Sequence, residues 1–251
     1  MQGVDYSKLS LSELGYVSMA DIKMKPRQWL IPGRVPVGDL TIIAGSYLGW
    51  RRAVAATIAA SVATGAARLG WPAPDRARRV LYAADASDWM DDVSPLLSAA
   101  GADLGTVDLM GDCVSLKNID HWRRRIVEAS PGLLVIDRIE SYLSGTSLYP
   151  SPSLYRRLSP LVEMSRELGF GVLATAELSR FRAASFPFSA AAYLIEMPVW
   201  GCYQLSTIKN KHAAEPPLVR LQEDELEGLD CYGESRPTIR LTPIEDAASA
   251  T

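Results

Sequence analysis

The sequence TIIAGSYLGWRR, residues 41–52, decides the fold that the rest of the chain is expected to take. Residues 41–44 are apolar or β-branched and predict a short buried strand. Residues 53–64 are rich in alanine, the best helix former, and predict a helix. The stretch is therefore expected to form a strand, an eight-residue loop at residues 45–52 and a helix. A phosphate-binding loop needs this local order.

The loop lacks the residues with which such a loop binds a nucleotide. In the motif G-x-x-x-x-G-K-[S/T], a sixth-position Gly lets backbone N–H groups close on the phosphates, and a Lys and a Mg²⁺-binding hydroxyl follow. Gly45 and Gly49 are present, but the last three positions hold Trp50, Arg51 and Arg52. In a glycine-type conformation Trp50 would cost on the order of 1–3 kcal/mol and crowd the phosphates. Arg52 would put a positive charge where a metal ligand belongs.

Length and charge bound the organisation of the chain. With 251 residues, 48% of them hydrophobic, it can bury one sizeable core. We expect a lead-in segment at residues 1–28, one domain at 29–244 and a flexible tail at 245–251. The net charge of −3 argues against a generally basic nucleic-acid-binding protein and leaves room only for a local basic channel.

Cysteine and histidine usage predicts neither a disulfide framework nor a metal site. The three cysteines are far apart without C-x-x-C spacing, and there are two histidines: Cys113, Cys202, Cys231, His121 and His212. Residues 1–16 show no secretory signal, and the longest apolar stretch, 53–67, is too short to span a bilayer. We therefore expect a cytoplasmic protein that does not insert into a membrane.

Apolar runs alternate with amphipathic segments along most of the chain. Further strands are expected at 80–83, 106–109, 133–136 and 171–175, and helices at 89–100, 119–129 and 153–168. From residue 193 onward, closely spaced strands are expected at 193–197, 203–208, 219–222 and 238–241. The sequence thus predicts an α/β fold, with a mainly parallel central sheet flanked by helices and antiparallel C-terminal strands.

Several short motifs occur along the chain, and their order and spacing together are specific. They are WLIPGRVPVGDLTIIAG at 29–45, IAASVATG at 58–65, VLY at 80–82, AAGADL at 99–104, LVID at 134–137 before SYL at 141–143, and KNK at 209–211. Between about residues 29 and 221 the chain resembles the RecA-like P-loop ATPases of plasmids and phages related to the hexameric replicative helicase RepA. The resemblance implies that Asp137 is the metal-binding residue of the Walker B strand. It also implies that Lys209 and Lys211 reach the nucleotide of a neighbouring subunit.

The chain departs from that family where the family carries its catalytic groups. After the strand at 80–82, the family has a Ser-Ala-Glu-Asp-Asp-like run whose Glu polarises the attacking water, and Ala86 stands at the Glu position here. The family's His-Leu-Asn-Lys-like sensor is replaced by ELSR at 177–180. A carboxylate at Glu177 would repel a γ-phosphate. With the P-loop Lys and hydroxyl also missing, we expect relaxed or redirected function.

Several of these residues have two interpretations. Asp137 could bind Mg²⁺, but we favour a salt bridge to Arg52. Arg51 and Arg52 could hold nucleotide or DNA phosphates, or form a solvated helix start, where positive charge opposes the helix dipole. Lys209 and Lys211 are either inter-subunit fingers or surface charges.

Arg180 and Arg182 lie in a segment that mixes cations with aromatic residues, RFRAASFPF at 180–188. Such interleaving suits stacking and phosphate contacts with single-stranded DNA. Contact with a protein partner, or local packing, explains it equally well.

The sequence therefore predicts a hydrolysis-deficient RecA-like protein, a DNA-associated or oligomeric scaffold or regulatory subunit in replication, recombination or mobile-element biology. Expected partners are either further copies of itself or an intact RecA-like ATPase, together with single-stranded DNA, and no cofactor is expected. One alternative is a weak ATP-dependent helicase or ATPase using ATP and Mg²⁺, with Arg51 in place of Lys and Asp85 or Asp88 in place of Glu. Another is a protein that binds a nucleotide or a single strand without hydrolysis.

Overall fold

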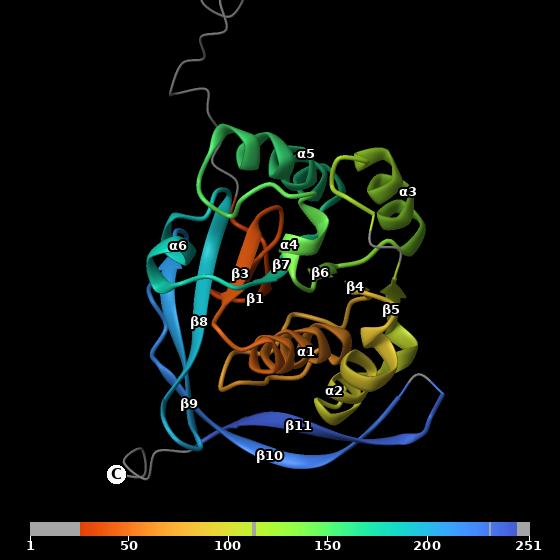
Figure 1. The fold of residues 1–251 in the computed structure, drawn as a ribbon, viewed down its shortest axis with the longest axis vertical. Coiled ribbons are helices and arrows are strands. Elements are labelled where there is room, and N and C mark those ends of the chain that lie inside the picture. The colour runs from red at the N-terminus through yellow and green to blue at the C-terminus, as the bar shows by residue number, and fades with distance from the viewer. Residues whose placement is uncertain (1–25, 112–113, 231, 245–251) are drawn as a thin grey trace, which may run out of the picture.

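The computed structural model describes residues 26–111, 114–230 and 232–244 (Figure 1). Within them, a nine-stranded sheet has the order β11-β10-β9-β8-β3-β7-β6-β4-β5. Its strands are β3 (Leu40–Ala44), β4 (Val80–Ala83), β5 (Val107–Met110), β6 (Leu133–Ile136), β7 (Gly171–Ala176), β8 (Ser189–Val199), β9 (Cys202–Asn210), β10 (Val219–Leu229) and β11 (Ser235–Pro243). The pairs from β5 to β8 in this order are parallel, and those from β8 to β11 are antiparallel. A separate small sheet pairs β1 (Trp29–Ile31) with β2 (Val35–Pro36).

Helices cover both faces of the parallel part of the sheet. On one face lie α1 (Leu48–Thr64) and α2 (Ser94–Ala99), and on the other α3 (Ile119–Ala129), α4 (Ile139–Tyr142) and α5 (Pro152–Leu168). The short helix α6 (Arg180–Ser185) packs against β8 and β9. This arrangement confirms the predicted fold class. The central strands β3, β4, β6 and β7 are buried along their whole length, as expected for parallel strands covered on both faces.

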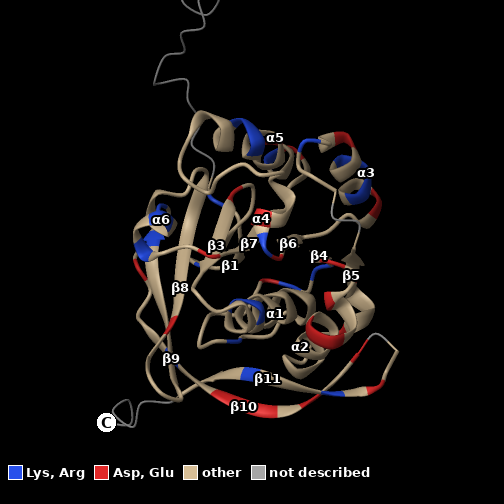
Figure 2. Cartoon of the chain, in the orientation of Figure 1, with Lys and Arg blue, Asp and Glu red and all other residues tan. Residues whose placement is uncertain are grey.

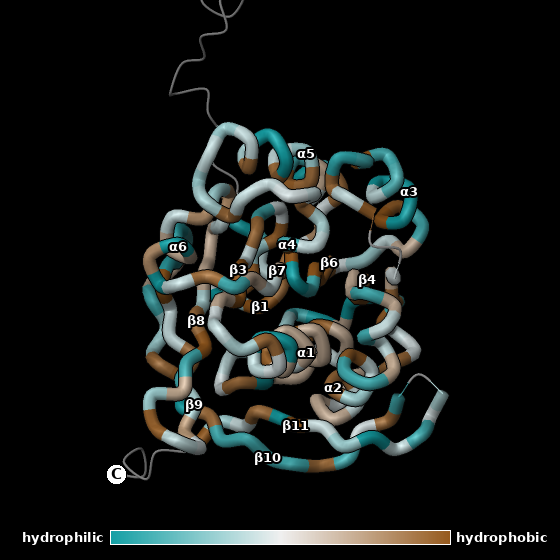
Figure 3. The backbone as a smooth tube through the Cα atoms, in the orientation of Figure 1, coloured by the Kyte–Doolittle hydropathy of each residue, from teal (hydrophilic) through white to brown (hydrophobic). Residues whose placement is uncertain are grey.

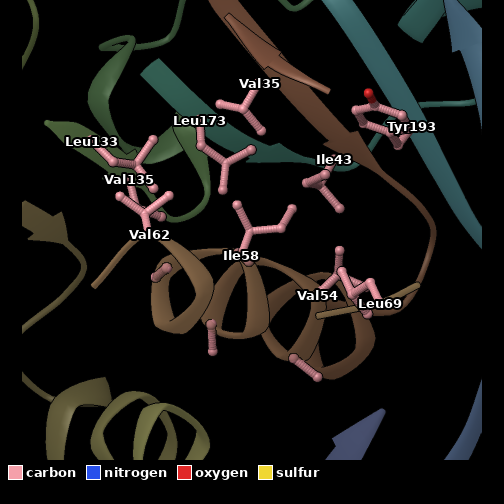
Figure 4. Close-up of a cluster of buried hydrophobic side chains, with 14 of the residues drawn as sticks. Val35, Ile43, Val54, Ile58, Val62, Leu69, Leu133, Val135, Leu173 and Tyr193 are labelled. Carbon is pink, nitrogen blue, oxygen red and sulfur yellow. The ribbon is translucent and has the colours of Figure 1, made fainter. Parts of the chain in front are cut away.

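The helix α1 is enclosed from all sides. Every residue from Arg51 to Ala63 is buried, and a helix that is apolar all round has to be enclosed in this way. One side faces the parallel strands, where Figure 4 shows Ile58 near Ile43 and Leu173. The hairpin of β10 and β11 passes over α1 and α2 on the side away from those strands (Figures 1 and 3).

The structure corrects one predicted helix. The helix expected at 89–100 is a π-helical segment, Trp89–Val93, followed by α2. Pro95 has no N–H with which to continue an α-helical ladder, and the N–H of Ser94 bonds to the carbonyl of Trp89, five residues back. Several other elements match their predicted bounds within a few residues, and α3 and β6 match them fully.

Some predictions fall outside the part of the chain that the structure describes. These are residues 1–25 of the lead-in segment, the tail at 245–251, and Cys113 and Cys231. Among the described residues, no helix is long and apolar enough to cross a membrane. The same residues hold no group of three or more His, Cys, Asp or Glu side chains that could bind a metal ion.

The close approach of the β10–β11 hairpin to α2 generates a prediction. A Cβ added at Gly228 would lie 2.2 Å from the carbonyl oxygen of Pro95, which is backbone and cannot swing aside. We expect Gly228→Ala to lower the free energy of unfolding by about 1–3 kcal/mol in urea denaturation. In the control variant Gly105→Ala, the added Cβ meets only the flexible side chain of Asp103, at 3.3 Å. This change should alter the free energy of unfolding by less than about 0.5 kcal/mol. Equal effects of the two changes would mean that the hairpin does not pack tightly on α2.

Candidate functional site

The candidate site lies where four parallel strands end together. The last pair of residues between β3 and β7 is Ala44 with Ala176, and the last pair between β4 and β6 is Ala83 with Ile136. The chain continues from β3 into α1 on one face of the sheet, and from β6 into α4 on the other. In open α/β sheets, ligands bind outside the carboxyl ends of the strands at such a divergence. The residues selected from the sequence, 45–52 and Asp137, lie at this edge.

The predicted eight-residue loop is much shorter in the structure. Only Gly45, Ser46 and Tyr47 separate β3 from α1, because α1 begins at Leu48. Tyr47 is the extended N-cap residue, and its ring lies over Gly49, where an added Cβ would approach the ring to 2.9 Å. Gly49 therefore has a packing role.

The first turn of α1 carries all three residues that depart from the motif. Trp50 has helical backbone angles, so the expected glycine-type strain is absent. Its ring contacts those of Tyr47 and Tyr203, at centroid distances of 4.7 and 4.8 Å. Two positions along a helix correspond to about 200°, so Trp50 faces away from Arg52. The indole thus packs toward β9. The expectation that Trp50 crowds the phosphate position is therefore wrong.

Arg52 is the centre of a buried ion-pair network. Its side chain is only 4% exposed, and Nε, Nη1 and Nη2 donate to Asp137, Asp92 and Asp88 respectively. The remaining oxygen of Asp137, Oδ1, accepts a hydrogen bond from Thr175 Oγ1 at 2.7 Å. The structure thus contains the predicted pairing of Arg52 with Asp137.

Burial and charge act in opposite directions on Arg52. Burial by itself lowers the pKa of the guanidinium, but attraction to and hydrogen bonding with Asp137, and then Asp88, outweigh it and raise that pKa above its ordinary value. Arg138 Nη2 adds a second positive charge, 3.0 Å from Asp88 Oδ2. The raised pKa keeps the guanidinium of Arg52 charged at any physiological pH.

Arg51 closes on the loop that precedes it. It is buried, and its Nη1 donates to the carbonyl oxygen of Gly45. Burial lowers its pKa, and attraction to Glu140, Glu177 and Asp137 compensates only in part. Since Arg51 and Arg52 are both buried, the interpretation as a solvated helix start is wrong.

The candidates for water activation are held in local contacts. Asp85 Oδ1 accepts hydrogen bonds from Ser87 N at 3.1 Å and Ser87 Oγ at 2.9 Å, and Asp88 is bound to Arg52 and Arg138. Ala86 is exposed. Glu177 lies near Arg51, and its N–H donates to Glu140 Oε1 at 2.6 Å.

The remaining candidates lie away from this network. Lys209 Nζ donates to Ser189 Oγ at 2.9 Å, and burial lowers its pKa to about 8. It therefore packs against its own chain, whereas Lys211 is exposed in the turn after β9.

The two arginines of α6 also have partners within the chain. Arg180 Nη2 is 3.3 Å from Glu196 Oε2, and the Arg182 guanidinium stacks 4.0 Å from the ring centroid of Tyr149. Phe181 between them is 82% exposed.

Sequence reasoning missed three members of the network: Asp92, Thr175 and Arg138. Asp88 directly precedes the helix predicted at 89–100, and Asp92 follows Asp88 by four residues, so their spacing was a usable signal. Thr175 lies near the end of β7, and Asp137 directly follows the neighbouring strand β6, but only the sheet order shows that the two residues meet. Nothing in the sequence indicated Arg138, which has a left-handed backbone at φ 56°.

A comparison with protein-family models identifies the class. Residues 12–179, more than half of the chain, match the AAA domain model, which describes AAA-like P-loop ATPases. Together with the sheet order and the position of the loop after β3, this defines a P-loop ATPase fold. The chain belongs to the AAA domain family. No curated protein matches it.

The network generates a prediction about stability. Arg52→Ala leaves Asp137, whose side chain is fully buried, without its cation, and should lower the free energy of unfolding by about 3–5 kcal/mol. Adding Asp137→Asn should recover part of this loss, because the amide oxygen still accepts from Thr175. The control is Arg123→Ala, which breaks an exposed pair with Glu167 and should cause little change. If urea denaturation gave the same midpoint for Arg52→Ala and Arg123→Ala, the network would not stabilise the fold.

Proposed function

We propose that this chain is a hydrolysis-deficient P-loop ATPase-fold protein that acts as a scaffold or regulatory subunit. The observation that carries the proposal is the guanidinium of Arg52, bound to Asp137. Arg52 stands at the motif position of the Mg²⁺-binding hydroxyl, and Asp137 at that of the Walker B carboxylate. A cation supplied by the chain thus takes the carboxylate that Mg²⁺ would need.

ATP with Mg²⁺ does not fit the residues at this edge. Both oxygens of Asp137 are engaged, one by Arg52 and one by Thr175. Arg51 donates into the loop itself, to Gly45, and only three residues lie between β3 and α1. A metal ion arriving here would have to displace the buried guanidinium from Asp137 and would then lie beside it, with only Asp88 and Asp92 left to pair with Arg52.

The positions of Asp85 and Asp88 argue against the alternative of a weak ATPase. A general base must reach the attacking water with its carboxylate free. Asp88 is bound by two arginines, and Asp85 closes a turn with Ser87. Glu177, at the sensor position, adds negative charge beside the place where a γ-phosphate would lie.

The biological setting of the proposal comes from the resemblance to RepA-type ATPases. We propose a cytoplasmic protein that assembles with copies of itself or with an intact RecA-like ATPase. The same resemblance suggests replication, recombination or mobile-element biology, with single-stranded DNA as a partner. The exposed Phe181 and Lys211 are compatible with such contacts, whereas Lys209, bonded to Ser189, does not support a role as an inter-subunit finger.

The first functional prediction concerns ATP. The purified protein should hydrolyse ATP no faster than a buffer control, and millimolar ATP with Mg²⁺ should not raise its melting temperature, because only a ligand that prefers the native state stabilises it. Phosphate release and a thermal-shift titration measure the two. Turnover that disappears in Asp137→Ala would contradict the proposal.

The second functional prediction restores the motif. Trp50→Gly, Arg51→Lys and Arg52→Ser together should release Asp137 and permit binding of ATP with Mg²⁺, seen as a concentration-dependent rise in melting temperature. Hydrolysis should stay slow, since Ala86 provides no base. Adding Asp137→Ala to the triple variant is the matched control and should remove the Mg²⁺ dependence. Brisk turnover by the triple variant alone would show that the catalytic Glu has been placed wrongly.

A further inference from the structure

A pocket lies on the side of α1 that faces away from Asp137, around Tyr47 and Trp50. It has a volume of about 410 Å³, within the usual range for ligand sites of roughly 300–1,000 Å³. Its walls come from the start of α1, the π-helical segment, the turn between β8 and β9, and the strands β9 to β11. Neither Arg52 nor Thr175, the residues bound to Asp137, lines this pocket, whereas Asp92, a partner of Arg52, does.

Four aromatic residues line this pocket: Tyr47, Trp50, Trp200 and Tyr203. The ring of Trp50 is inclined by 59° to that of Tyr47 and by 69° to that of Tyr203. Rings set at such angles form a corner, in which one ligand group can touch more than one aromatic surface. Trp200, in the β8–β9 turn, is 91% exposed, and tryptophan is among the residues most enriched at binding hot spots.

Carboxylates surround the aromatic residues. Glu223 Oε2 accepts a hydrogen bond from Tyr203 Oη at 2.6 Å. Burial, and then the neighbouring Glu223, raise the pKa of Tyr203 to about 12, so the phenol stays protonated and keeps Glu223 oriented. Asp91 is exposed, and its charge is among those that raise the pKa of Arg236 on β11. Figure 2 shows the acidic stretch of β10, where Glu223 lies.

Aromatic rings and carboxylates together favour one class of ligand, an organic cation. Aromatic faces attract organic cations by their negative quadrupole, and nearby carboxylates add Coulomb attraction. An anion such as a nucleotide or a DNA phosphate would be repelled. A guanidinium suits the pocket best, because its flat face stacks on a ring while its N–H groups reach carboxylates at the edge.

We propose that this pocket binds the side chain of an arginine carried by a basic segment of a partner protein. The acidic β10 strand favours a basic segment around that arginine, and Trp200 would cover it from the exposed side. The inference goes beyond the proposed function, since it holds whether or not ATP is hydrolysed. It also gives a function to Trp50, which replaces the glycine of the motif, because Trp50 and Tyr47 form part of the pocket wall.

The test uses the intact protein and two capped peptides. The first is acetyl-Gly-Arg-Gly-amide, and the second has citrulline, the neutral isostere of arginine, in place of Arg. In NMR spectra of protein with ¹⁵N-labelled indole groups, assigned by substitution, the arginine peptide should shift the signals of Trp50 and Trp200. The citrulline peptide should not, and the shifts should weaken with added salt.

Single substitutions assign the effect to the pocket. Trp200→Ala and Glu223→Gln should each weaken binding of the arginine peptide about three- to tenfold. Trp200 is exposed, and Gln retains an acceptor for Tyr203, so both variants are expected to fold. Phe181→Ala, which removes a similarly exposed aromatic ring elsewhere, should leave binding unchanged.

Three results would overturn the inference. The first is equal binding of the citrulline and arginine peptides. The second is the absence of any shift at Trp50 and Trp200 at high peptide concentration. The third is self-association, measured by sedimentation, that is lost in Trp200→Ala, because the occupant would then be a second copy of this chain.

Discussion

The buried guanidinium of Arg52, beside the end of β6, is the constraint on which the rest of the site depends. Arg52 cannot be taken out of water without partners, and Asp137, Asp88 and Asp92 supply them. These carboxylates come from the end of β6 and from the segment after β4, so the network fixes both to α1. A buried ion pair adds little net stability compared with apolar packing, but breaking one is costly, and this favours a single arrangement of the segments.

The same constraint organises the opposite side of the helix. With Arg52 directed to Asp137, the geometry of a helix turns Trp50 toward β9, where Tyr203 receives it. Binding of Asp88 and Asp92 by Arg52 also sets the position of Asp91 at the rim of the aromatic pocket. The two sites on either side of the first turn of α1 are therefore not independent in structure, although they differ in chemistry.

Much of the fold could be predicted because buried parallel strands appear as continuous apolar runs. The bounds of β6 and α3 were predicted correctly, and the Arg52–Asp137 pair followed from the motif positions of the two residues, which the family resemblance brings to one site. The start of α1 was missed because alignment to a motif presupposes the loop of that motif. Here Tyr47 packs on Gly49 and the helix starts early. The contact between Trp50 and Tyr203 depends on the path of β9, for which no local pattern exists.

The enclosure of α1 also has a consequence in time. Its outer side is covered by β10 and β11, and β10 begins at Val219, 155 positions after the helix ends at Thr64. At the usual synthesis rate of about 5–20 residues per second, a ribosome needs roughly 8–30 s to make the intervening chain. During that interval an alanine-rich helix has no cover on one side and is open to wrong association. The last strands to be made, β10 and β11, are thus the ones that cover α1 and end its exposure.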